Sequence, residues 1–132
     1  MFRDLSKYIE EKIGLNGQTI SSDTTTAGNV IDLQGFESVA VILKTDVVAT
    51  GDVTLLLEDS DVVDSGFITV DTDFLTRTLA STKITTANTT ERISYIGNKR
   101  YLKVSVVSAN TASLYASVLV VKGDPITLPA VE

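Results

Sequence analysis

The segment from Ile93 to Val107, ISYIGNKRYLKVSVV, shows most clearly how this chain folds. Within it, Leu102, Val104 and Val106 alternate with polar or aromatic residues. This period of two indicates a half-buried β-strand, because successive side chains of a strand point to opposite faces. A Gly-Asn pair precedes the run, and both residue types are common in tight turns. The segment therefore predicts two strands joined by a short turn.

Similar short runs of β-branched and aliphatic residues fill the chain from Val30 to Gly123. They include VIDL, SVAVILK, DVTLLLED, FITV, ERISYI and SLYASVLVVK, with Gly, Asp, Asn and Thr between them. A spacing of about 8–12 residues with turn signals is typical of a sandwich or barrel. We therefore expect an all-β, antiparallel two-sheet sandwich of about eight strands. A jelly roll is the favoured topology, and an immunoglobulin-like sandwich fits the pattern almost as well.

The last apolar run, residues 113–122, differs from the others because both of its alternating sets are largely apolar. Leu119 and Val121 belong to the set opposite the one that contains Val118 and Val120. A strand of this kind is usually buried on both faces. We expect one face to join the core and the other to be covered by a second surface.

The first residues predict a short amphipathic helix of about three turns that ends at Gly14. So short a helix is marginal in water, so its apolar side must dock on its own domain or on a neighbouring subunit. The residues at helical spacing are Phe2, Leu5, Ile9 and Ile13, with Tyr8 widening the stripe.

These patterns divide the chain into four parts. They are an N-terminal helix or arm (residues 1–15), a polar Ser/Thr/Gly-rich linker (residues 16–29), the sandwich domain (residues 30–123) and an extended tail with both prolines (residues 124–132).

Composition narrows the chemistry that this chain can perform. The sequence contains no cysteine and no histidine, so it lacks the thiolate nucleophile, the usual general base and the commonest transition-metal ligand. Its net charge of -6 disfavours broad binding to nucleic acid or to an anionic membrane. No signal-peptide pattern or membrane-length apolar run is present, so we expect no export. We predict no catalytic, cofactor-binding or metal-binding residues, and no enzymatic activity.

An acidic cluster at the end of the third apolar run and just beyond it is the best candidate for an ion site. Clustered carboxylates suit hard cations such as calcium, and a close pair could also serve a glycosidase. The segment lacks the spacing of an EF-hand loop, and the chain is poor in the aromatic residues that line sugar clefts. A solvated loop is the favoured interpretation. The cluster consists of Glu58, Asp59, Asp61 and Asp64.

Two cations, Lys99 and Arg100, follow the predicted turn in an otherwise acidic chain. Cations at a turn keep it soluble and discourage pairing between sheet edges. Alternatively, they pair with carboxylates, either on this chain or on an acidic partner, and an arginine can do so with two parallel hydrogen bonds.

Several segments resemble, in the same order, the capsid decoration or cement proteins of tailed phages, a family that includes the Bordetella phage cement protein. They are NVIDLQGFESVAVILKT (29–45), LLLEDSD (55–61) with FITVDTDFL (67–75), SYIGNKRYLKV (94–104) and VVKGDP (120–125). Two positions depart from the family pattern: Ser94 stands where glycine is usual, and Lys103 where arginine is usual. The second change removes a planar donor that could bind a carboxylate through two hydrogen bonds. The matching residues are Glu58, Ser60, Asp61, Gly97, Lys99, Arg100 and Tyr101.

The resemblance implies a jelly-roll domain that self-associates as a dimer or trimer and clamps the major capsid protein from outside. It places the protein on the capsid surface of the virion, and in the host cytoplasm during assembly. A head-completion, tail or fibre-attachment protein is the alternative, and a carbohydrate-binding β-sandwich is a more distant one. The residues expected to contact partners are Phe2, Leu5, Tyr8, Ile9, Lys99, Arg100, Tyr101, Leu119 and Val121.

Overall fold

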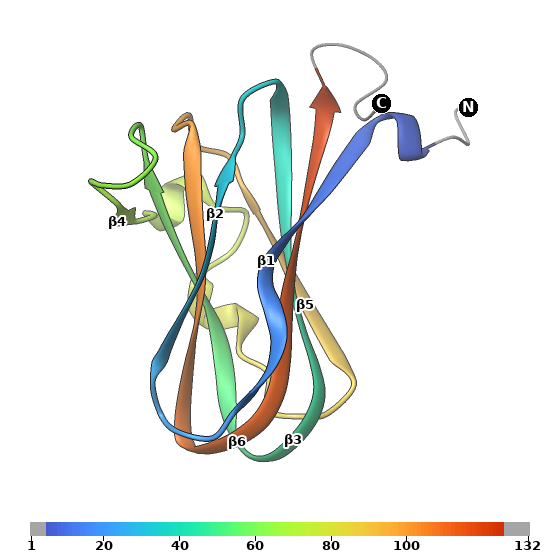
Figure 1. Ribbon diagram of the computed structural model, residues 1–132, viewed down its shortest axis with the longest axis vertical. Coiled ribbons are helices and arrows are strands. Elements are labelled where there is room, and N and C mark those ends of the chain that lie inside the picture. Colours follow the sequence, from blue (N-terminus) through green and yellow to red (C-terminus); the bar gives the residue numbers. More distant parts are fainter. Residues whose placement is uncertain (1–4, 126–132) are drawn as a thin grey trace.

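The computed structural model describes residues 5–125, which form antiparallel strands with three short 3-10 turns (Figure 1). The strands are β1 (Ile9–Ile20), β2 (Thr25–Asp32), β3 (Phe36–Ser60), β4 (Ile68–Thr69), β5 (Thr89–Tyr95) and β6 (Tyr101–Pro125). The 3-10 turns are η1 (Leu5–Lys7), η2 (Thr72–Phe74) and η3 (Leu79–Thr82).

The two long strands, β3 and β6, organise the molecule. Each has 25 residues, and they pair antiparallel from Phe36 opposite Pro125 to Ser60 opposite Tyr101. Midway, the register shifts and both strands fold back at the lower end of the molecule (Figure 1). Gly51 adopts a φ of 80° at this bend, which is a left-handed conformation that glycine accepts without steric cost. Each long strand thereby passes from one layer of the sandwich to the other.

The shorter strands complete two layers. In the first layer, β1 pairs with residues 114–123 of β6, and β5 pairs with residues 39–45 of β3. In the second, β2 pairs with residues 101–107 of β6, and β4 pairs with residues 58–59 of β3. Because β3 and β6 contribute to both layers, the six strands supply eight segments, four to each layer.

In chain order, the first segment pairs with the eighth, the second with the seventh, the third with the sixth, and the fourth with the fifth. That is a long hairpin rolled up on itself, which is the connectivity of a jelly roll. The expected all-β antiparallel sandwich is confirmed.

The core lies between the layers and consists of aliphatic side chains from alternate strand positions. Leu43 and Leu57, from the two halves of β3, are both fully buried, as are Leu102 and Val104 of β6. The alternation predicted for residues 101–107 therefore places its apolar set inside. Burial of this aliphatic surface is the main source of stability in a domain of this size.

The prediction of an N-terminal helix over Phe2–Ile13 is wrong for the residues that the structure describes. Phe2 lies outside the described residues; a single 3-10 turn covers Leu5–Lys7, and from Ile9 the chain is a strand of the first layer. Ile9 and Ile13 fit a strand as well as a helix, because residues four apart also share a strand face. Pairing with β6 satisfies the backbone groups of the segment, whereas an isolated helix this short is marginal.

The polar linker expected for residues 16–29 is also corrected. Residues 16–20 end β1, and residues 25–29 begin β2 in the second layer. Threonine is a good strand former, so a polar segment can serve as an outer strand of a sheet. Gly28 is required here, since a Cβ at that position would collide with the carbonyl oxygens of Gly14 and Val104. Of the tail expected over residues 124–132, the first two residues end β6 and the rest lie outside the described residues.

We predict that Leu57→Ala lowers the free energy of unfolding by about 2–5 kcal/mol, because it leaves a cavity where both layers meet. Val63→Ala is the control: its side chain is 52% exposed, and a change within about 0.5 kcal/mol is expected. Urea unfolding followed by circular dichroism measures both. Equal losses for the two variants would contradict the assignment of Leu57 to the core.

Candidate interaction surfaces

The two cations of the Gly-Asn turn are paired with carboxylates of the same chain. Lys99 Nζ lies 2.9 Å from Asp61 Oδ2. The Arg100 guanidinium donates two hydrogen bonds to Asp32, from Nε to Oδ1 at 3.0 Å and from Nη2 to Oδ2 at 2.9 Å. The hydrogen bond from Arg100 holds the pKa of Asp32 below its usual value. Of the alternatives left open by the sequence, the structure shows pairing within the chain.

A third cation, Lys122, has the most buried ion pair at this end of the sandwich. Its side chain is only 6% exposed, and its Nζ lies 2.8 Å from Glu10 Oε1. It also donates to the main-chain carbonyl of Asp32 at 3.1 Å and lies 4.6 Å from the centre of the Phe36 ring. Lys122 thus joins β1, β2, β3 and β6. The sequence analysis did not identify Lys122. Its position offered a signal, because Lys122 lies on the same strand face as the buried residues Val118 and Val120.

Tyr95 fixes the turn that carries these cations. Its hydroxyl donates to Asp59 Oδ2 at 2.7 Å and accepts from the main-chain N–H of Lys99 at 3.1 Å. Burial, followed by the hydrogen bond to Asp59, raises the pKa of the Tyr95 phenol well above its usual value. A Cβ at Gly97 would collide with the Tyr95 ring, so glycine is needed there for close approach.

The acidic cluster does not converge on one point. Asp59 accepts from Tyr95, and Asp61 pairs with Lys99. Within residues 5–125, no group of three or more acidic side chains is arranged to hold a metal ion.

The outward side of the first layer carries an exposed apolar surface. Residues directly opposite each other in neighbouring strands share a face, so Ile13, Leu119 and Ile42 form one row across β1, β6 and β3. Val121 and Ala40 form the next row. The Ile13 side chain is 54% exposed and that of Leu119 is 39% exposed. We call these five residues the outer-face patch.

The prediction that the last strand is covered on both sides therefore holds only for its inner face within residues 5–125. The outward residues Leu119 and Val121 keep part of their surface open to solvent.

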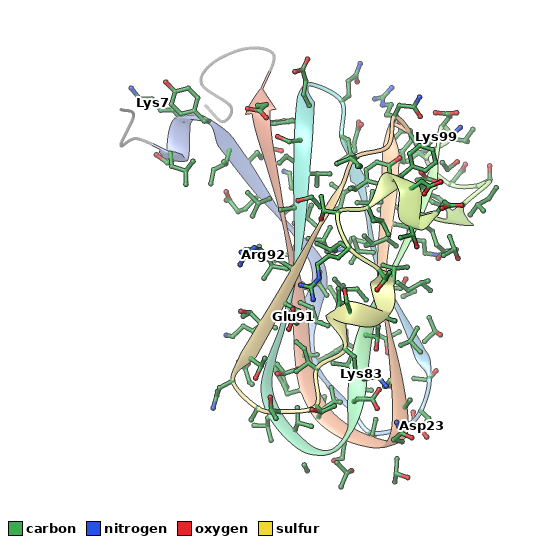
Figure 2. The ribbon with its side chains drawn as sticks, turned by 180° about the vertical axis from the view of Figure 1, so that it is seen from behind. Lys7, Asp23, Lys83, Glu91, Arg92 and Lys99 are labelled. Atoms are coloured by element: carbon green, nitrogen blue, oxygen red, sulfur yellow. The ribbon has the colours of Figure 1, made fainter. Side chains whose placement is uncertain are left out.

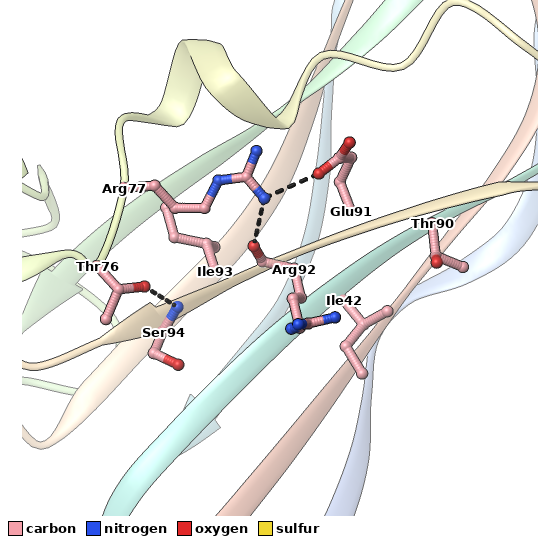
Figure 3. Close-up of a pocket in the computed structure, with 8 residues that line it drawn as sticks. All are labelled: Ile42, Thr76, Arg77, Thr90, Glu91, Arg92, Ile93 and Ser94. Atoms are coloured by element: carbon pink, nitrogen blue, oxygen red, sulfur yellow. Dashed lines mark hydrogen bonds and ion pairs between the residues drawn. The ribbon is translucent and has the colours of Figure 1, made fainter.

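The free edge of β5 is covered by the segment before η3 (Figure 3). Thr76 exchanges hydrogen bonds with Ser94: its N–H donates to the Ser94 carbonyl, and its hydroxyl accepts from the Ser94 N–H. Arg77 Nη1 pairs with Glu91 at 2.8 Å and donates to the Arg92 carbonyl at 3.0 Å. An edge whose carbonyls are already bonded is a poor template for another strand.

Six of the nine residues predicted to contact partners fall into two groups. Lys99, Arg100 and Tyr101 lie at the ion-paired end of the sandwich, whereas Ile9, Leu119 and Val121 lie on or beside the outer face of β1 and β6. Leu5 is exposed in η1 and Tyr8 is half buried beside it. Figure 2 shows Lys7 and Lys99 at the same end of the molecule but on opposite sides.

Comparison with known proteins indicates similarity of fold only. No family model and no curated protein matches the sequence. The structure resembles the PBSX exported protein XepA with a TM-score of 0.60 and 16% identity, over 89% of this chain and 38% of that chain. This chain therefore spans well under half of XepA.

Two further solved structures are similar at lower scores. The SPBc2 prophage-derived protein YomS has a TM-score of 0.47 and 13% identity, over 88% of this chain and 95% of that one. A subunit of the disulfide-linked pili of Bacillus endospore appendages has a TM-score of 0.45 and 13% identity, over 90% of each chain. Separately, no helix in residues 5–125 is long and apolar enough to cross a membrane.

The ion pairs predict that stability depends on pH. The pKa values of Glu10 and Asp32 are lowered in the folded protein, in each case chiefly by hydrogen bonds from a cation. A lowered carboxyl pKa contributes stability above the unfolded-state pKa and loses it as the pH falls through the folded-state value. We therefore expect the free energy of unfolding to decrease as the pH falls below about 4.5.

In the variant Arg100→Ala, this decrease should be smaller than in the wild type, because Asp32 loses the partner that lowers its pKa. Urea titrations between pH 7 and pH 3 measure the difference. Lys83→Ala is the matched control, since Lys83 is exposed and forms no ion pair within the described residues. If the pH profiles of Arg100→Ala and the wild type were parallel, the Arg100–Asp32 pair would not contribute as described.

Proposed function

We propose that this protein is a structural component of a phage virion that decorates the outer surface of the head and bridges major capsid subunits. The observation that carries the proposal is the meeting of the family-like segments at one end of the jelly roll. Asp32, Asp61, Lys99 and Arg100 come from three of those segments and are paired with one another there. Lys122, from the fourth segment, donates to Asp32 beside them.

This arrangement suits a protein that acts by binding. The ion pairs and the Tyr95 contact hold the strand ends and turns in one conformation, so little conformational entropy is lost when a partner is bound. The exposed side chains of Lys99 and Arg100, with the half-buried Tyr101 beside them, would orient the capsid contact. A standard interface of about 800 Å² on each partner, repeated over many copies, gives avidity without strong single contacts.

The physical effect would be mechanical. A rigid domain that spans two capsid subunits must be detached or broken before they separate, so it raises the barrier to rupture under the outward pressure of packaged DNA. The absence of histidine and cysteine from the sequence is compatible with a role that requires no catalysis.

Electron microscopy of purified virions tests the proposal. We expect the protein on the outer shell in regular positions that follow the symmetry of the capsid, in on the order of hundreds of copies. A ring of about a dozen copies at the portal or tail would support a head-completion or tail role instead. Absence from the particle, with saturable binding on a glycan array, would favour the carbohydrate-binding alternative.

A further inference from the structure

The outer face of the first layer carries two complementary charges, one on each side of the outer-face patch. Glu11 of β1 lies opposite Val121, in the row that also contains Ala40. Arg92 of β5 lies opposite Ile42, in the neighbouring row. The acidic group and the basic group therefore occupy opposite corners of a surface whose centre is apolar.

Neither of these two charged side chains has a partner within the described part of the chain. Glu11 and Arg92 are both exposed, and no ion pair or side-chain hydrogen bond connects either to residues 5–125. The other arginines in that range, Arg77 and Arg100, are each paired with a carboxylate. Figure 3 shows the Arg92 side chain on the side of β5 that faces Ile42, away from Arg77 and Glu91.

We propose that a second copy of this chain docks on the outer-face patch and forms a two-fold symmetric dimer. In a face-to-face dimer, the two-fold axis lies in the plane of the interface. An axis through the centre of the patch, perpendicular to the line that joins Glu11 and Arg92, brings Glu11 of each copy to Arg92 of the other. The same operation stacks the apolar centres, so two ion pairs flank a desolvated core.

A second copy fits this surface because the complement of each charge is already present on the chain. A partner of another kind would need an acidic group, a basic group and an apolar centre at matching distances. Pairing through the edge of β5 is disfavoured because Thr76 and Arg77 occupy it. Two sheets that pack face to face with aligned strands are a common solution for exposed apolar faces.

The dimer goes beyond the proposed function and does not depend on it. It uses the side of the sandwich formed by β1, β6, β3 and β5, and it leaves the end that carries Lys99 and Arg100 free for another partner. If the isolated protein proved to be a monomer, the proposed role in the virion would therefore be unaffected. If the protein were absent from the virion, the proposed dimer would likewise be unaffected.

Light scattering coupled to size-exclusion chromatography tests the dimer on the full chain. At concentrations of about 10–100 μM, we expect a mass of twice 14.1 kDa, or about 28 kDa. Leu119→Arg places a charge in the apolar centre, and Arg92→Glu places two carboxylates together at each corner. Each should weaken dimerisation at least tenfold, as measured by sedimentation equilibrium.

Charge exchange separates a specific contact from general damage. Glu11→Arg alone should also weaken the dimer, whereas the double variant Glu11→Arg/Arg92→Glu should restore it. A mixture of the two single variants should give mixed dimers, because each then offers what the other needs. Such recovery also shows that both single variants are folded. Lys83→Glu is the control for charge reversal and should dimerise like the wild type.

A wild-type mass of 14.1 kDa at 100 μM would overturn the proposal. So would a dimer that persists in both Leu119→Arg and Arg92→Glu, since it would use another face. Loss of the dimer in the single charge variants without recovery in the double variant or the mixture would also overturn it, because the Glu11–Arg92 contact would then be absent.

Discussion

The antiparallel pairing of β3 with β6 is the constraint on which the rest of this structure depends. The two strands stay paired over nearly their whole length while both bend from one layer into the other. Every other strand pairs with one of these two, so the bend decides which layer each strand joins. The left-handed glycine and the register shifts at the bend are therefore as important to the architecture as the aliphatic core that the bend encloses.

The ion pairs at the end of the sandwich near Lys122 and Arg100 follow from this strand geometry. The rolled hairpin brings Glu10, Asp32, Lys122 and Arg100 together from four parts of the sequence. Burying Lys122 would be costly if its ammonium were left alone, but Glu10, a main-chain carbonyl and an aromatic ring surround it. The cations that look available in the sequence thus hold the strand ends together, and their remaining exposed surface is what a partner could contact.

The molecule presents two surfaces with different physical characters. The ion-paired end is polar and contains the pairs Lys99–Asp61, Arg100–Asp32 and Lys122–Glu10. The outer face of the first layer is apolar at its centre, and beside it lie Glu11 and Arg92, which have no ion-pair partner within residues 5–125. The proposed dimer contact and the proposed capsid contact would use different regions, so the two would not compete. The similarity to XepA, at 16% identity, extends to the fold alone.

The sequence by itself determined the fold class, because the period of two in segments such as residues 101–107 and their regular spacing admit little else. It also placed Leu119 and Val121 on one face of the last strand and Val118 and Val120 on the other, since alternation separates the faces; which face points outward was decided by the tertiary structure. The tertiary structure alone decided that residues 9–20 form a strand. The spacing of Ile9 and Ile13 fits a helix and a strand equally well, and the strand forms because the edge of β6 is open for pairing. The tertiary structure likewise decided the partners of Lys99, Arg100 and Lys122, since ion pairs between residues distant in sequence depend on how the hairpin rolls, which local pattern does not encode.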